Sequence, residues 1–223
     1  MIVELSYLIG ETETVLIENH PKPRVVPRKR ISDGSMDNTS LLEIQTHNGT
    51  HIDVPWHMFQ DGMTVTDFDI SDFVFDRPVL IQCPKGDRGT ITREDLEAAS
   101  PVLEQADILL IYTGFSDYRG SDPMRYVHQC PSFSVEAARY VVENLAALRC
   151  IGVDCLSMEN IEEARKTGYP AHKILLGEGR RFFLAEDLNL RPALGKSVSR
   201  VSVIPLRVVG TDGSPATVLA EVN

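Results

Sequence analysis

The chain has 223 residues, of which 43% are hydrophobic and 24% charged, and its formal net charge at neutral pH is −10. This length allows one sizeable hydrophobic core, so we expect a single domain over residues 1–223. A negative surface repels phosphate backbones, and no long run of Lys and Arg offsets it. This argues against nucleic acid as a partner.

The sequence also bears on compartment. It contains no stretch of eighteen apolar residues, so we expect no membrane span. Its first ten residues lack the basic region of a signal peptide. Four cysteines are scattered without a CxxC pair, as in cytosolic proteins whose thiols stay free and buried. We therefore expect a cytoplasmic protein.

The first half of the chain is predicted to contain strands, a long loop and one helix. Strands are expected at residues 2–7, 41–54, 78–83 and 107–113. Residues 10–40 are rich in proline, glycine, serine and charge, and they predict a long loop that leaves room for short strands. Residues 92–100 predict a helix, with Thr92 as its N-cap.

The second half alternates helices with short strands. Residues 134–148 give the clearest helical pattern, because Ser134 can cap the helix and apolar residues recur at helical spacing. Shorter helices are expected at 159–166 and 172–176. Strands are expected at 150–154, 182–185, 201–206 and 218–222. The alternation predicts an α/β protein with a mixed sheet of short strands and packed helices.

One segment carries most of the chemistry. The string His47-Asn-Gly-Thr-His51-Ile-Asp53-Val-Pro-Trp-His57 holds three of the six histidines and an aspartate. Imidazole and carboxylate together suit zinc, manganese or iron. Side chains alternate between the faces of a strand, so these four odd-numbered residues would share one face. We interpret the segment as a metal centre built around His47, His51 and Asp53.

The spacing within this segment sets two conditions. Four extended residues span about 13 Å, which is too far for His47 and His51 to meet at one ion unless the turn dipeptide Asn48–Gly49 bends the chain. Pro55 interrupts the strand before His57. His57 is therefore either a further ligand or a free imidazole for proton transfer, and we favour the second role.

The string HNGTHIDVPWH resembles the HxGTHxDxPxH motif of the cyclase-like metal hydrolases, a family that includes bacterial kynurenine formamidase and isatin hydrolase. The resemblance implies one domain of the swivelling β/β/α type. It extends over most of the chain, through residues 2–6, 113–115, 154–157 and 172–177 and through Glu186.

The resemblance also implies roles for single residues. The implied ligands of one or two divalent ions, zinc or manganese, are His47, His51, Asp53, His172 and Glu186. His57 would donate and accept protons. Glu178 lies nearer to His172 in the sequence and is the alternative to Glu186 as the later acidic ligand.

The implied reaction is hydrolysis of a small amide C–N bond, such as that of N-formylkynurenine, by metal-activated water. The alternatives are ring opening of a lactam or cyclic imide, and a non-catalytic metal-binding module. Kynurenine formamidases carry Trp-Pro-Gly where this chain has Leu16-Ile17-Glu18, so Trp56 and Phe59 are the candidates for aromatic contact with the substrate. A homodimer or homotetramer is expected.

Overall fold

The computed structural model describes residues 1–15, 17, 20–177 and 179–223. Expectations for Leu16, Glu18 and Glu178 therefore lie outside the described residues. Within these ranges a nine-stranded mixed sheet forms the centre of the molecule. Its strands are β1 Ile2–Glu4, β4 His51–Asp53, β5 Val74–Phe75, β6 Pro78–Gln82, β8 Ile108–Tyr112, β10 Cys150–Val153, β11 Phe183–Glu186, β12 Val198–Pro205 and β13 Gly213–Val222.

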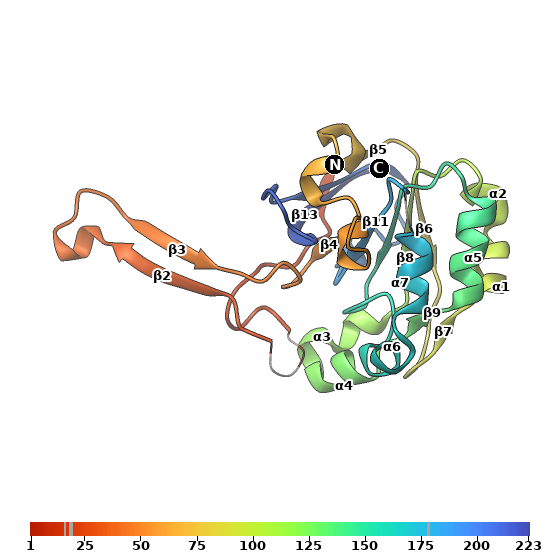
Figure 1. Cartoon of the computed structure of the whole chain (residues 1–223), viewed down its shortest axis with the longest axis horizontal. Helices are drawn as coiled ribbons and strands as arrows, with labels where there is room; N and C mark the ends of the chain where they lie inside the picture. Colours follow the sequence, from red (N-terminus) through yellow and green to blue (C-terminus); the bar gives the residue numbers. More distant parts are fainter. Residues whose placement is uncertain (16, 18–19, 178) are drawn as a thin grey trace.

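The sheet has a parallel half and an antiparallel half. Strands β11, β10, β8 and β6 run parallel, whereas β4, β13, β12 and β5 continue the sheet in antiparallel pairs. Strand β12 also contacts β6, so the sheet nearly closes on itself. The N-terminal strand β1 pairs with β13 and brings the two chain ends together (Figure 1).

Helices cover the outer face of the parallel half. Their bounds are α1 Arg93–Glu97, α2 Ser100–Leu103, α3 Tyr118–Ser121, α4 Pro123–His128, α5 Val135–Asn144, α6 Ile161–Thr167 and α7 Pro170–Leu175. Helices α5, α7 and α1 lie beside β8 and β6, and α3, α4 and α6 gather at one end (Figure 1). A short parallel pair, β7 Thr90–Ile91 with β9 Ser132–Phe133, lies near α1.

Alternate residues of β8 show why its apolar run forms a strand. Leu109 and Ile111 pack into the core beneath the helices, whereas Ile108 and Leu110 pack into the core enclosed by the curved sheet. Both faces of the strand are thus buried, which a continuous apolar run satisfies. The predicted α/β class, with a mixed sheet and packed helices, is confirmed.

Several predicted boundaries are confirmed and two are corrected. Thr92 and Ser134 cap their helices as expected. The helix predicted for residues 134–148, however, is α5, and it ends at Asn144. The continuous strand predicted for 41–54 is wrong, because a turn separates β3 Thr39–Glu43 from β4.

Residues 10–40, predicted as a long loop with room for short strands, contain one strand of a β-hairpin. Strand β2 Arg24–Lys29 pairs antiparallel with β3. The resulting hairpin projects far from the body of the molecule (Figure 1). Every residue of β3 is exposed, and so is every residue of β2 except the half-buried Val26.

Two expectations about compartment can be compared with the structure. The four cysteines, all within the described ranges, are buried and unpaired, as predicted. Over the same ranges, no helix has the length and apolar character needed to cross a membrane.

Candidate metal centre

A turn before β4 positions the first histidine. The Asn48 N–H donates to the Gln45 carbonyl over 3.1 Å, and the Asn48 side-chain oxygen accepts from the Gln45 N–H over 3.0 Å. Gly49 has a φ of +66°, a left-handed conformation that glycine adopts without strain. The bend predicted at Asn48–Gly49 brings the His47 and His51 rings to 5.1 Å between centroids. His47 itself precedes the strand, so the prediction that it shares a strand face is wrong.

Strand β4 and its neighbour β11 supply three further residues of the site. His51 and Glu186 occupy directly opposed positions on the antiparallel β4–β11 ladder, so their side chains project from the same face. Asp53 lies two residues after His51 and shares that face. All three side chains are buried.

The inward-facing atoms form a continuous cluster. Asp53 Oδ1 lies 2.8 Å from His47 Nδ1 and 3.3 Å from His51 Nε2. Glu186 approaches His51 Nε2 to 3.5 Å and His172 Nε2 to 3.2 Å. Asp53 Oδ2 lies 3.8 Å from His172 Nε2. The five predicted ligands, separated by up to 139 residues in the chain, are thus brought together.

His57 stands at the edge of this cluster. The 3-10 helix Pro55–His57 begins at the proline and turns His57 away from the strand. His57 Nε2 lies 4.0 Å from Asp53 Oδ2, and its side chain is 26% exposed against 2% for Asp53. His57 therefore faces both the buried acid and the opening of the site.

The second ring nitrogens of the buried histidines have partners outside the cluster. His51 Nδ1–H donates to the Gly49 carbonyl over 2.8 Å. His172 Nδ1–H donates to Glu159 Oε2 over 2.7 Å. These bonds leave Nε2 of both rings directed inward, as outer partners of metal-bound histidines do. The role of Glu159 was not predicted, and its only sequence signal is a carboxylate placed before α6.

A second residue missing from the sequence prediction is Asp212, in the turn before β13. Its Oδ2 lies 2.9 Å from His47 Nε2 and 3.0 Å from His57 Nδ1. The side chain is 32% exposed, at the mouth of the site. No motif in the sequence marks this position.

The main chain and a serine hold Glu186 in place. The Met158 N–H donates to Glu186 Oε1 over 2.6 Å, and the Ser157 hydroxyl donates to the same oxygen over 3.3 Å. Residues 154–157, one of the strings that resemble the family, therefore lead directly into the site.

The same string supports a turn at the end of β8. Asp154 accepts hydrogen bonds from the main-chain N–H groups of Thr113 and Gly114 and from the hydroxyls of Thr113 and Ser116, all between 2.6 and 3.0 Å. Asp154 is fully buried. Two strings singled out in the sequence thus meet as one buried network.

The charges of the site are strongly coupled. Burial lowers the pKa of His47, but Asp53 and Asp212 raise it overall to about 9. Burial likewise opposes protonation of His172, yet Glu159 and Glu186 raise its pKa to about 10. The carboxylates of the site therefore stabilise positive charge on the neighbouring imidazoles.

The acids show the complementary effect. Burial and the Asp53 charge raise the pKa of Glu186, but His172 and His51 hold it at about 2. Hydrogen bonds from His47 and His57 hold the pKa of Asp212 well below its usual range. Ionised acids and inward imidazole nitrogens form a donor set that fits a divalent ion.

A cavity of about 150 Å³ opens onto the cluster. The five predicted ligands and His57 line it. The rest of its described lining consists of Val15, Ile17, His20, Leu156, Ser157, Ile161, Arg165 and Tyr169. Trp56 and Phe59 are not among these lining residues. Trp56 donates through Nε1 to the Gln60 carbonyl over 3.0 Å, and Phe59 packs against the core beneath the helices.

Comparison with known proteins shows the family of the chain. The family model described as "Putative cyclase" matches residues 3–160. The chain belongs to the cyclase family. Among curated relatives of this cyclase-family chain, cyclase-like protein 1 of Arabidopsis thaliana is 30% identical over 190 residues, which cover 83% of this chain and 70% of the relative.

Solved structures agree with the cyclase-family assignment. A potential metal-dependent hydrolase with cyclase activity is 26% identical, with a TM-score of 0.76 over 99% of this chain and 96% of the other. Isatin hydrolase A from Labrenzia aggregata, bound to benzyl benzoate, is 24% identical, with a TM-score of 0.82 over 99% and 93%. The second likeness shows the shared fold.

Proposed function

We propose that this protein is a metal-dependent hydrolase that cleaves a small amide C–N bond. The observation that carries the proposal is the pair of buried carboxylates, Asp53 and Glu186, facing the inward nitrogens of His47, His51 and His172. Such a pair is costly to bury without a cation. One solved structure similar to this chain is that of a potential metal-dependent hydrolase with cyclase activity.

The geometry supports a particular distribution of ligands. His47, His51 and Asp53 offer atoms that lie within 4.8 Å of one another, and so do Asp53, His172 and Glu186. Asp53 belongs to both groups, so the residues fit either one ion or two ions that share it. A zinc or manganese ion bound here would polarise a carbonyl and lower the pKa of water.

His57 is the proposed proton-transfer residue. Its Nδ1 is occupied by Asp212, and its Nε2 faces the cluster at the opening of the cavity. It can therefore take a proton from water and deliver it to the leaving nitrogen, a role that contributes about 10²–10⁴-fold in rate.

The cavity supports a small substrate. Its volume of about 150 Å³ and its apolar wall of Val15, Leu156 and Ile161 favour a compact group with an apolar face. We propose a formamide, with lactams and cyclic imides as the alternative. Trp56 and Phe59 remain the proposed aromatic contacts with the substrate, although neither lines this cavity.

An assay on a panel of N-formyl anilines, aryl lactams and cyclic imides tests the function. The protein is stripped with a chelator and then reloaded with zinc or manganese. We expect hydrolysis of at least one amide class to disappear on stripping and return on reloading. Equal activity with and without metal would overturn the proposal, and metal binding without any turnover would favour a non-catalytic module.

We also propose that the protein is a homo-oligomer, as a homodimer or homotetramer, held by the β2–β3 hairpin. An isolated two-stranded hairpin is marginally stable in water, yet this one exposes Val25, Leu42 and Met36. Residues 20–45 carry five Lys and Arg against three Asp and Glu, whereas the rest of the chain carries 17 against 29. The basic hairpin is thus complementary to the acidic body of a second copy.

A further inference from the structure

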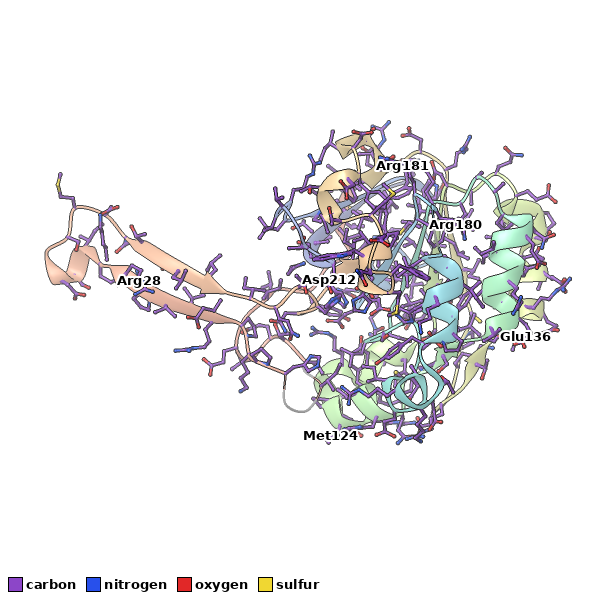
Figure 2. All side chains as sticks on the ribbon, in the orientation of Figure 1. Arg28, Met124, Glu136, Arg180, Arg181 and Asp212 are labelled. Atoms are coloured by element: carbon purple, nitrogen blue, oxygen red, sulfur yellow. The ribbon has the colours of Figure 1, made fainter. Side chains whose placement is uncertain are left out.

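Asp212 contacts both His47, a predicted ligand, and His57, the proposed proton-transfer residue. Its main-chain carbonyl accepts from the Val54 N–H over 3.1 Å, directly before the 3-10 helix that carries His57. Figure 2 labels Asp212 on the side of the body that faces the hairpin. The turn at Asp212 is therefore fixed to the segment that contains the histidines.

The residue after Asp212 shows how closely this turn packs on the site. A Cβ atom at Gly213 would lie 2.5 Å from the Ile52 carbonyl oxygen and 2.8 Å from His47 Cε1. The turn can lie against the His47 ring only because this position is glycine. The contact between Asp212 and His47 is thus part of a tightly packed arrangement.

One oxygen of Asp212 serves two imidazoles with different proposed roles. Oδ2 accepts from His47 Nε2–H and from His57 Nδ1–H, and the two rings lie 4.3 Å apart between centroids. Each imidazole has only two nitrogens, so these bonds determine which nitrogen faces the cluster. They direct His47 Nδ1 and His57 Nε2 toward Asp53.

We propose that Asp212 is a positioning residue that couples metal binding to proton transfer, by orienting His47 as a ligand and His57 as the proton-transfer group. The inference rests on the proposed function. A carboxylate behind a metal-binding histidine fixes its tautomer, and a carboxylate behind a catalytic histidine does the same. Here one carboxylate does both, so its removal should affect two separable properties.

The first test measures zinc affinity by competition with a chelator. Asp212→Asn should weaken zinc binding by about 10–100-fold, the usual cost of losing an outer partner of a ligand. Asp61→Asn removes an exposed carboxylate close to the motif and should leave the affinity unchanged. Unchanged affinity in Asp212→Asn would overturn the link to His47.

The second test uses ring-nitrogen NMR of selectively labelled His57. The wild-type protein should show a downfield Nδ1–H proton on His57, both metal-free and zinc-loaded, and Asp212→Asn should lose it or shift it strongly. The same signal in both proteins would overturn the link to His57. Because this readout needs neither metal nor substrate, its result is independent of whether the proposed hydrolase function holds.

The third test is a double-mutant cycle on kcat at saturating zinc. Asp212→Asn alone should lower kcat by at least about tenfold, but it should cost little more in a His57→Ala background, because it acts through that ring. Full additivity would overturn the coupling. If the wild type neither binds zinc nor hydrolyses any amide, the proposed function fails by itself.

A crystal structure of the zinc-loaded protein would show whether Asp212 itself binds an ion. His47, His57 and Asp212 also lie close enough to hold an ion between them. The proposal expects no ion at Asp212 and hydrogen-bonding distances to both rings. An ion coordinated by Asp212 would make it a ligand and overturn the positioning role.

Discussion

His51 and Glu186 face each other across the β4–β11 ladder, with His51 Nε2 3.5 Å from Glu186 Oε2. The register of two adjacent strands therefore sets the separation between an early motif residue and a late acid. The Met158 N–H and the Ser157 hydroxyl donate hydrogen bonds to the other oxygen, Glu186 Oε1. The strand register and these hydrogen bonds hold the Glu186 carboxylate in one position, and such preorganisation favours tight binding of an ion.

This arrangement predicts a graded effect of two conservative substitutions. Glu186→Gln should weaken zinc binding by more than the ~10–100-fold typical of an outer partner, because it removes an inward-facing charge. Glu159→Gln, which alters only the partner of His172 Nδ1, should fall within that range. Chelator competition on both variants measures the difference. Equal losses would show that Glu186 is not a ligand.

A second prediction separates His57 from the ligands. His57→Ala should keep its metal but lose about 10²–10⁴-fold in kcat, as expected for a general acid–base group. His51→Ala should lose metal and turnover together. Elemental analysis and amide hydrolysis on the same samples decide between the roles, and a metal-free His57→Ala protein would make His57 a ligand.

A third prediction concerns the buried network at Asp154. Asp154→Ala leaves the N–H groups of Thr113 and Gly114 without their acceptor, so it should lower the free energy of unfolding by roughly 3 kcal/mol. For a chain of this size that corresponds to a melting temperature lower by about 6–12 °C. Circular dichroism checks it, with the exposed Asp61→Ala as the control. A change below about 1 °C would contradict the structural role given to Asp154.

A fourth prediction concerns the hairpin. Arg24 and Glu43 are paired across its base. Replacing residues 25–42 by Asn-Gly should therefore close the strands with a short turn and leave the body folded. Light scattering should then report a monomer where the full chain gives an oligomer. An unchanged mass would show that the subunits meet elsewhere.

The sequence predicted the site better than its surroundings, for physical reasons. The bend at Asn48–Gly49 and the break at Pro55 are local effects of backbone conformation, so residue types alone predict them. The contacts of Asp212 with His47 and His57 could not be predicted in this way. They depend on a register between β13 and β4 that pairs Gly213 with Asp53, two residues that lie 160 positions apart in the sequence.

Short elements were the main omission in the fold. Helices α3 and α4 each have six or fewer residues, too few for a hydrophobic period to emerge. Where the hairpin lies, the sequence predicts a long loop with room for short strands and no defined hairpin, because β2 and β3 are almost wholly exposed and neither shows the alternation of a half-buried strand.

The metal content of the purified protein tests the central claim most directly. Stripped protein is titrated with zinc or manganese, and bound metal is measured by elemental analysis beside amide hydrolysis of the same samples. We expect on the order of one to two ions per chain, with activity rising in proportion to occupancy. Less than about a tenth of an equivalent, with no rebinding after supplementation, would contradict it.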